Sequence, residues 1–282
     1  MTEARTVVID GVRQIYRVAG RGPVCLVHPG GPGVRPDYLR MPGLEEHLTL
    51  IYLDPVGSGD SDLLPGGDYS MSRYVQFANG VLDDFGASTA YFLGHSHGGF
   101  VALQYGLDSP QRLDGLILYD TAPMWNDELN EAATKEMAVF VRRWPRRPEA
   151  VLAARTWDAA AAGTDNESYC RFLAAILPAY FYDYRATTRR LGREIRLGVR
   201  HDPNRLPVEW DVRDRLGEID VPTLVIGGSY DFRCPIDFAY QLSARMPNAR
   251  LVELGDSGHF GHIEQPADFT EAIVAFVISR GR

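Results

Sequence analysis

The stretch Ala90-Tyr-Phe-Leu-Gly-His-Ser-His-Gly-Gly-Phe-Val-Ala-Leu-Gln-Tyr-Gly-Leu107 decides how the chain is expected to fold. It opens with an apolar run, Ala90–Leu93, that predicts a buried strand, and it closes with helical spacing from Phe100 to Leu107. Between the two lies a Gly-x-Ser-x-Gly pattern centred on Ser96. Glycines allow a very tight turn, which holds such a serine strained and exposed at the start of a helix. The stretch therefore predicts a strand, a sharp turn carrying a nucleophile, and a helix.

The same alternation of strand and helix signals continues on both sides of this stretch. Further continuous apolar runs are Val24–Val27, Leu50–Leu53, Gly115–Tyr119, Thr223–Ile226 and Arg250–Leu254. Helical spacing occurs in Ser72–Phe85, Ile236–Met246 and Asp268–Val277, and a hairpin is expected for Thr6–Ile9 and Gln14–Val18. Strands that alternate with helices form crossover units. We therefore expect an α/β fold with a mainly parallel eight-stranded sheet flanked by helices.

One connection is too long for a crossover. From 122 to 210 the strand signal disappears, and Ala, Arg, Glu and aromatic residues recur at helical spacing. A structureless loop of that length is improbable in a folded domain. The expected domain organisation is a core made of residues 1–121 and 211–282, with residues 122–210 as a helical cap inserted between its two parts.

Composition narrows the class of protein. The chain has 282 residues and a net charge of −8, which disfavours nucleic-acid binding because phosphate-tracking proteins carry a basic excess. Its three cysteines are far apart, so neither a disulfide framework nor a paired-cysteine zinc site is expected. The first residues lack a signal-peptide pattern, and no apolar run reaches membrane-span length. We expect a cytoplasmic protein with no membrane contact, no metal and no cofactor, and we expect nothing specific about its oligomeric state.

A serine nucleophile needs a base and an orienting acid. Asp231 and His259 each follow a predicted strand, so they should meet Ser96 at the carboxyl rim of the sheet. Each assignment has an alternative. Asp231 could cap the helix that begins near Pro235 instead, Asp256 could replace it as the acid, and His262 competes with His259 as the base.

The glycine-rich segment His28-Pro-Gly-Gly-Pro-Gly33 follows another predicted strand. Such a loop can offer a backbone N–H to an oxyanion. We predict that the amides of Gly31 and His97 form the oxyanion hole, with a purely structural glycine turn as the alternative. The second glycine-rich loop, Asp54-Pro-Val-Gly-Ser-Gly-Asp-Ser61, lacks the lysine of a P-loop and is interpreted as a rim turn.

Together with Asp231 and the segment Gly258-His-Phe-Gly-His-Ile-Glu-Gln-Pro266, these motifs resemble the α/β-hydrolase superfamily, and Gly30-Gly-Pro-Gly33 is similar to its proline iminopeptidase-like branch. That branch typically has His-Gly-Gly-Pro-Gly, whereas Pro29 follows His28 here, and its cap glutamates beside a Trp-rich motif have no counterpart in this chain. The resemblance implies a serine hydrolase that cleaves an ester, amide or N-terminal peptide bond of a small-molecule or short-peptide substrate. A thioesterase, a biosynthetic isomerase or cyclase, and a non-catalytic ligand-binding receptor are the alternatives.

Substrate choice should belong to the cap, because a triad is generic. We predict that Trp125, Trp144, Tyr180 and Phe181 line a pocket over Ser96. Other aromatic candidates are Trp157, Tyr169, Phe172, Tyr182 and Tyr184. The alternative for each is that it packs the cap on the core. Arg185, Arg189 and Arg190 could meet an acidic ligand group, or they could lie on a solvated helix face.

Overall fold

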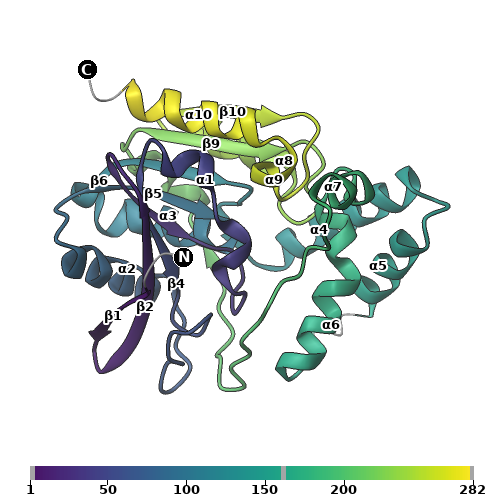
Figure 1. Cartoon of the computed structure of the whole chain (residues 1–282), viewed down its shortest axis with the longest axis horizontal. Helices are drawn as coiled ribbons and strands as arrows, with labels where there is room; N and C mark the ends of the chain where they lie inside the picture. Colours follow the sequence, from purple (N-terminus) through teal and green to yellow (C-terminus); the bar gives the residue numbers. More distant parts are fainter. Residues whose placement is uncertain (1–3, 160–162, 280–282) are drawn as a thin grey trace.

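An eight-stranded sheet lies at the centre of the computed structural model, which describes residues 4–159 and 163–279 (Figure 1). The strands are β1 (Ala4–Ile9), β2 (Val12–Gly20), β3 (Val24–His28), β4 (Thr49–Asp54), β5 (Ala90–His95), β6 (Leu113–Tyr119), β9 (Thr223–Gly228) and β10 (Ala249–Leu254). Their order is β1-β2-β4-β3-β5-β6-β9-β10. Residues 1–3 and 280–282 of the predicted core and residues 160–162 of the predicted cap lie outside the described part.

The strands from β4 to β10 in this order are parallel to one another, and β2 is antiparallel to both of its neighbours, β1 and β4. The predicted hairpin is confirmed: Asp10 and Gly11 connect β1 to β2 with φ values of 50° and 75°. Two consecutive residues with positive φ are the signature of the hairpin turn whose twist matches that of the strands. The predicted α/β class, with a mainly parallel eight-stranded sheet, is confirmed as well.

Helices cover both faces of the sheet (Figure 1). One face packs against α2 (Met71–Phe85), α3 (His97–Asp108) and α8 (Ile236–Arg245), and the other packs against α1 (Pro42–Glu45) and α10 (Pro266–Ile278). Shorter helices are η1 (Pro36–Leu39), η2 (Pro110–Arg112), η4 (Arg213–Glu218) and α9 (Gly261–Glu264). Burial on two faces explains why the central strands are continuous apolar runs in the sequence.

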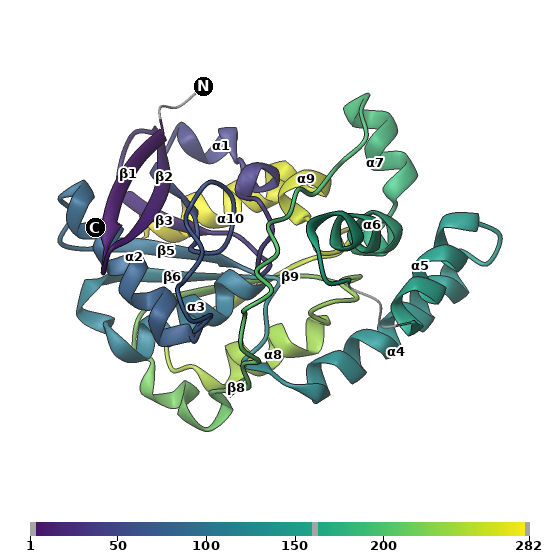
Figure 2. The same ribbon diagram turned by 90° about the horizontal axis from the view of Figure 1, so that it is seen from below.

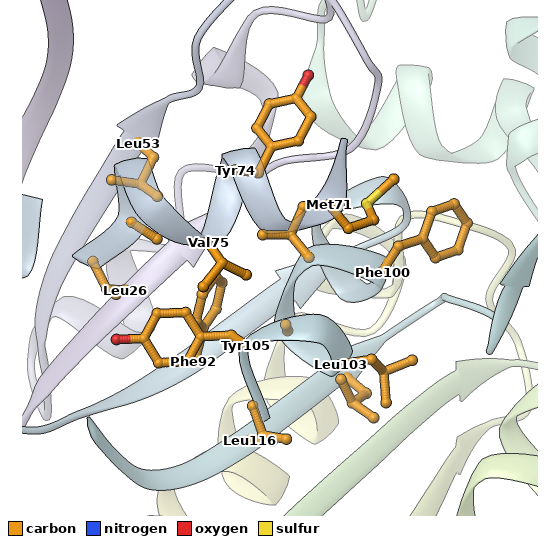
Figure 3. Packing of buried hydrophobic residues seen from close by; sticks show 14 of the residues in the cluster. Leu26, Leu53, Met71, Tyr74, Val75, Phe92, Phe100, Leu103, Tyr105 and Leu116 are labelled. Carbon is orange, nitrogen blue, oxygen red and sulfur yellow. The ribbon is translucent and has the colours of Figure 1, made fainter. Parts of the chain in front are cut away.

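The larger core cluster lies between the sheet and the helix pair α2 and α3, and Figure 3 shows part of it. The side chains labelled there are Leu26, Leu53, Met71, Tyr74, Val75, Phe92, Phe100, Leu103, Tyr105 and Leu116. Each fully buried side chain of this size stabilises the fold by about 1.5–3 kcal/mol. This packing fixes α3, and with it the helix start that follows Ser96.

The described residues 122–159 and 163–191 contain a group of helices beside the carboxyl end of the sheet (Figures 1 and 2). They are α4 (Asp127–Arg143), α5 (Pro148–Asp158), α6 (Asn166–Ile176), η3 (Leu177–Tyr180) and α7 (Tyr184–Leu191). At the base, β7 (Met124–Trp125) pairs with β8 (Trp210–Asp211) in antiparallel fashion. A small apolar cluster joins the helices to Val34 and Phe232 of the flanking regions.

Among residues 4–159 and 163–279, no helix is both long enough and apolar enough to cross a membrane.

Candidate active site

Ser96 lies between the end of β5 and the start of α3, in a strained backbone conformation with φ 55° and ψ −119°. A Cβ atom on Gly94 would lie 2.2 Å from the carbonyl oxygen of Gly98, and one on Gly98 would lie 2.2 Å from that of His28. The turn can therefore close only with glycine at both positions. The Ser96 N–H donates to the Tyr119 carbonyl at 2.9 Å, which ties the turn to β6.

Asp231 and His259 form a buried pair at the ends of β9 and β10. His259 Nδ1 lies 2.7 Å from Asp231 Oδ2. The other carboxylate oxygen, Oδ1, accepts the N–H groups of Arg233 at 2.8 Å and Cys234 at 3.0 Å. Because the carboxylate can only accept, Nδ1 carries the proton and Nε2 is left as the basic nitrogen. The pair has the arrangement that a general base and its orienting acid require.

The alternative assignments do not fit this geometry. Helix α8 begins at Ile236 with no side-chain cap, so Asp231 is not its cap. Both ring nitrogens of His262 are occupied, since Nδ1 lies 2.9 Å from the Tyr119 hydroxyl and Nε2 lies 3.0 Å from the Tyr38 carbonyl. Burial lowers the pKa of His262 to about 4. Asp256 is exposed, and the carboxylate on His259 belongs to Asp231.

Ser96 opens into two adjoining compartments of one cavity. The larger compartment, of about 210 Å³, is lined by Ser96, His97 and helix α6, and the smaller one, of about 60 Å³, is lined by Ser96 and His259. The side chains from α6 are Tyr169, Phe172, Leu173 and Ile176, whose helical spacing places them on one face. Ser96 and His259, the histidine of the buried pair, therefore face a shared space.

The four predicted pocket residues divide into two pairs. Trp125 and Tyr180 line the larger compartment, together with Trp157. Phe181 is buried in a separate cluster with Leu177, Ile195 and Phe260. Trp144 ends α4, where the guanidinium of Arg147 lies 3.4 Å from its ring centre. Neither Phe181 nor Trp144 lines either compartment. These two side chains pack within the protein instead, which was the alternative stated for each.

The predicted oxyanion donors lie at the same cavity. Gly31 and His97 both line the larger compartment, and the His97 amide is the first of α3. Within the described residues, neither amide N–H donates a hydrogen bond to another group. The neighbouring Gly30 N–H is already used, because it donates to the Tyr38 hydroxyl at 2.7 Å. This leaves two free donors beside Ser96, at a helix N-terminus that favours negative charge.

A hydrogen-bond chain that the sequence did not reveal links this loop to the base. The Tyr38 hydroxyl accepts from Gly30 and therefore donates to His95 Nδ1, which lies 2.7 Å away. His95 Nε2 then donates to the His259 carbonyl at 2.9 Å. Burial lowers the pKa of His95 well below its ordinary value, so the ring stays neutral and keeps one donor and one acceptor. The histidine before Ser96 thus supports both the loop and the base.

Two further buried groups lie beside the pair. Burial raises the pKa of the Cys234 thiol well above its ordinary value, so the thiol stays protonated and is no rival nucleophile to Ser96. Burial and the charge of Asp231 raise the pKa of Asp120 in the same direction. Asp120 directly follows β6, so a polar residue at the end of a predicted strand was the signal that could have identified it.

Two sets of donor atoms lie within 4.8 Å of one another, namely those of His95, Asp120 and His259 and those of Asp231, Cys234 and His259. Most of these atoms already have partners. Both nitrogens of His95 are hydrogen-bonded, His259 Nδ1 is paired with Asp231, and the Cys234 thiol is protonated. These atoms therefore fit a hydrogen-bonded network of side chains better than the ligand set of a metal ion. That the protein needs no metal and no cofactor stays a prediction.

Comparisons with known proteins show the family to which the chain belongs. Residues 23–266 match the family described as alpha/beta hydrolase fold. The proline iminopeptidase of Saccharolobus solfataricus is 25% identical over 288 residues, covering 94% of this chain and 87% of that protein. The 2-hydroxy-6-oxo-6-phenylhexa-2,4-dienoate hydrolase of Comamonas testosteroni is 24% identical over 281 residues, covering 94% and 91%. The crystal structure of a Mycobacterium smegmatis proline iminopeptidase superimposes with a TM-score of 0.73 at 20% identity, covering 99% of this chain and 98% of that chain. On the match of residues 23–266, the chain belongs to the alpha/beta hydrolase fold family.

Proposed function

We propose that the protein is a serine hydrolase in which Ser96, His259 and Asp231 form the catalytic triad. The observation that carries the proposal is that strained Ser96 lines the same small cavity as His259, whose ring is hydrogen-bonded to Asp231. His259 Nε2 removes the Ser96 proton as Oγ attacks the substrate carbonyl, and the Gly31 and His97 amides stabilise the oxyanion. His259 returns the proton to the leaving group, and water then cleaves the acyl-enzyme.

The substrate is a small molecule with an ester, thioester or amide bond. One relative is a proline iminopeptidase, so an N-terminal peptide bond, whose amine is protonated near neutral pH, is the alternative to weigh. Within the described residues, no aspartate or glutamate lines either compartment, so nothing there neutralises a protonated amine. This favours an ester or amide of an acyl group over an N-terminal peptide bond.

The test uses 4-nitrophenyl butyrate and a fluorophosphonate probe. We expect the probe to label Ser96 of the wild type, and Ser96→Ala to lose the label and at least about a thousandfold in kcat. Ser109→Ala is the matched control, because Ser109 follows the other end of α3 and its hydroxyl only accepts from Asn79. Turnover retained by Ser96→Ala would overturn the proposal.

Isotopically labelled water separates hydrolysis from the alternative chemistries. Hydrolysis must place one solvent oxygen in the acid product, because water opens the acyl-enzyme. An isomerase, a cyclase or a receptor would incorporate none. A product without solvent oxygen, formed with Ser96-dependent turnover, would remove hydrolysis from the assignment.

A further inference from the structure

Arg233 is the feature of the cavity that the proposed hydrolysis does not use. Its backbone N–H donates to Asp231 Oδ1 at 2.8 Å, so the position of the residue is fixed by the catalytic acid itself. Arg233 lines both compartments, as Ser96 does. Nη1 of the guanidinium is buried and has no hydrogen-bond partner in the described part of the chain.

This arrangement contrasts with other arginines of the protein. Arg147 is paired with Asp183 at 2.9 Å, and Arg213 is paired with Asp211 at 2.6 Å. Arg233 forms no ion pair within the described ranges, although part of its charge is removed from solvent. A buried donor on a charged group without an acceptor costs free energy. Such a cost is tolerated where a ligand supplies the missing acceptor.

The other groups around the cavity do not cancel this charge. Arg233 is the only Asp, Glu, Lys or Arg lining either compartment in the part that the structure describes. Burial lowers the pKa of His95 and His97 well below its ordinary value, so both rings are neutral. Burial raises the pKa of Tyr180, so its hydroxyl stays protonated. Asp231 is nearby, and its oxygens are occupied by His259 and two backbone amides.

A neighbouring hollow carries the same sign of charge. It has a volume of about 270 Å³ and shares Trp125 and Tyr169 with the larger compartment. Its charged lining residues are Arg200, Asp202 and Arg205. Nη2 of Arg205 is also buried and has no partner within the described residues. The hollow beside the larger compartment is thus basic in a protein whose net charge is −8.

We propose that the substrate carries a carboxylate and that Arg233 binds it while the scissile carbonyl lies at Ser96. This inference rests on the proposed hydrolase function and specifies its substrate class. The planar guanidinium presents a fork of donors that matches the two oxygens of a carboxylate. The arginines of the neighbouring hollow attract the anion toward the cavity. A free N-terminal amine, in contrast, would be repelled.

The experiment compares anionic and neutral substrates of similar shape. In the first pair the carboxylate is on the acyl chain: mono-4-nitrophenyl glutarate carries it and 4-nitrophenyl pentanoate lacks it. In the second pair it is on the leaving group: 3-carboxyphenyl butyrate carries it and phenyl butyrate lacks it. We expect the wild type to prefer the anionic member of one series by at least about tenfold in kcat/KM. Arg233→Met should lower that preference, the ratio of kcat/KM for the anionic ester to kcat/KM for the neutral ester, by about 10- to 100-fold.

Arg196→Met is the matched control, because Arg196 is an exposed arginine paired only with Glu194. A binding measurement without turnover completes the test: calorimetry of glutarate with Ser96→Ala, alone and combined with Arg233→Met. We expect glutarate to bind the first protein and to lose at least about tenfold in affinity in the second.

The two proposals fail in different ways. Ser96-dependent turnover of the neutral esters, with no anionic preference in either series, would overturn the carboxylate inference alone. If none of the esters were turned over in a Ser96-dependent manner, the hydrolase function would be overturned. The glutarate binding measurement would then decide whether Arg233 binds a carboxylate. Glutarate bound equally well with and without Arg233 would overturn that role as well.

Discussion

Asp120 shows how one buried carboxyl can lie beside a triad without belonging to it. Its Oδ1 accepts the Gly228 N–H at 2.7 Å, while Oδ2 is buried without a partner in the described part of the chain. Burial and the nearby Asp231 charge raise its pKa well above the ordinary value. The protonated form, which this shift favours, accepts the Gly228 N–H without placing a second negative charge beside Asp231.

The Asp120→Asn and Asp120→Ala variants test this protonation state. Asn is neutral and similar in shape to the protonated acid, so Asp120→Asn should keep kcat within about threefold of the wild type. Asp120→Ala leaves the Gly228 N–H without its acceptor and should lower the free energy of unfolding by about 1–3 kcal/mol. Ester turnover and urea unfolding measure the two effects. A tenfold loss of kcat in Asp120→Asn would mean that the acid acts ionised.

Tyr38 connects the glycine loop to His95 through a single hydroxyl. In Tyr38→Phe the Gly30 N–H and His95 Nδ1 both lose their partner, so the free energy of unfolding should fall by about 2–4 kcal/mol. Because that loop carries the proposed oxyanion donor Gly31, we expect kcat to fall by about tenfold or more with a smaller change in KM.

Tyr52→Phe is the control for this substitution. The Tyr52 hydroxyl also accepts a backbone N–H, that of Met41 at 3.0 Å, and donates to Glu45 at 3.1 Å, and it lines neither compartment. It should lose stability and keep kcat. If both variants lost stability and both kept the wild-type kcat, Tyr38 would be a structural residue without a positioning role.

At the scale of elements, the side chain of Glu264 in α9 connects the segment between η3 and α7 to the loop that carries His259. Its carboxylate accepts the N–H groups of Gly258 at 2.8 Å, Tyr182 at 3.1 Å and Asp183 at 3.3 Å. One side chain therefore holds two segments that are far apart in the sequence. Burial raises the pKa of Glu264 to about 7, although these hydrogen bonds oppose the rise.

This pKa predicts a pH dependence of stability. Below about pH 4.5 both the folded and unfolded states hold the Glu264 proton, and between 4.5 and about 7 only the folded state does. Stability from this group is therefore fully present at low pH and is lost as the pH rises toward 7, by at most about 3 kcal/mol.

Glu264→Gln removes the titrating group. The free energy of unfolding of the wild type minus that of this variant should fall as the pH rises from 5 to 7.5, as urea unfolding can measure. Glu149→Gln, which removes a carboxylate paired with Arg185 on the protein surface, should show no such trend in that window. A value of wild type minus Glu264→Gln that rises toward pH 7.5 would contradict a raised pKa.

At the scale of the whole molecule, the sheet could be predicted because a strand that is buried on both faces is a continuous apolar run in the sequence. The runs near Val24, Leu50 and Ala90 became β3, β4 and β5, with ends one or two residues further on. Ser96, Asp231 and His259 could be predicted to lie near one another because parallel strands end at one rim.

The cavity could not be predicted in the same way, because a side chain's direction depends on how each helix is rotated against the core. Trp144 and Trp157 look equivalent in the sequence, yet only Trp157 lines the cavity. Arg185, a predicted candidate for binding an acidic ligand group, is paired with Glu149, whereas Arg233 lines the cavity from the loop that carries Asp231.

The cytoplasmic location of the protein stays a prediction.

The contact between Tyr180 and His259 has a consequence for how the two parts of the chain depend on each other. The His259 N–H donates to the Tyr180 carbonyl at 2.7 Å, so the last turn before Phe181 supports the backbone of the proposed catalytic base. The segment that lines the cavity for a substrate therefore also holds the group that is proposed to activate Ser96. A change of sequence in η3 that altered the shape of the cavity would at the same time shift the base.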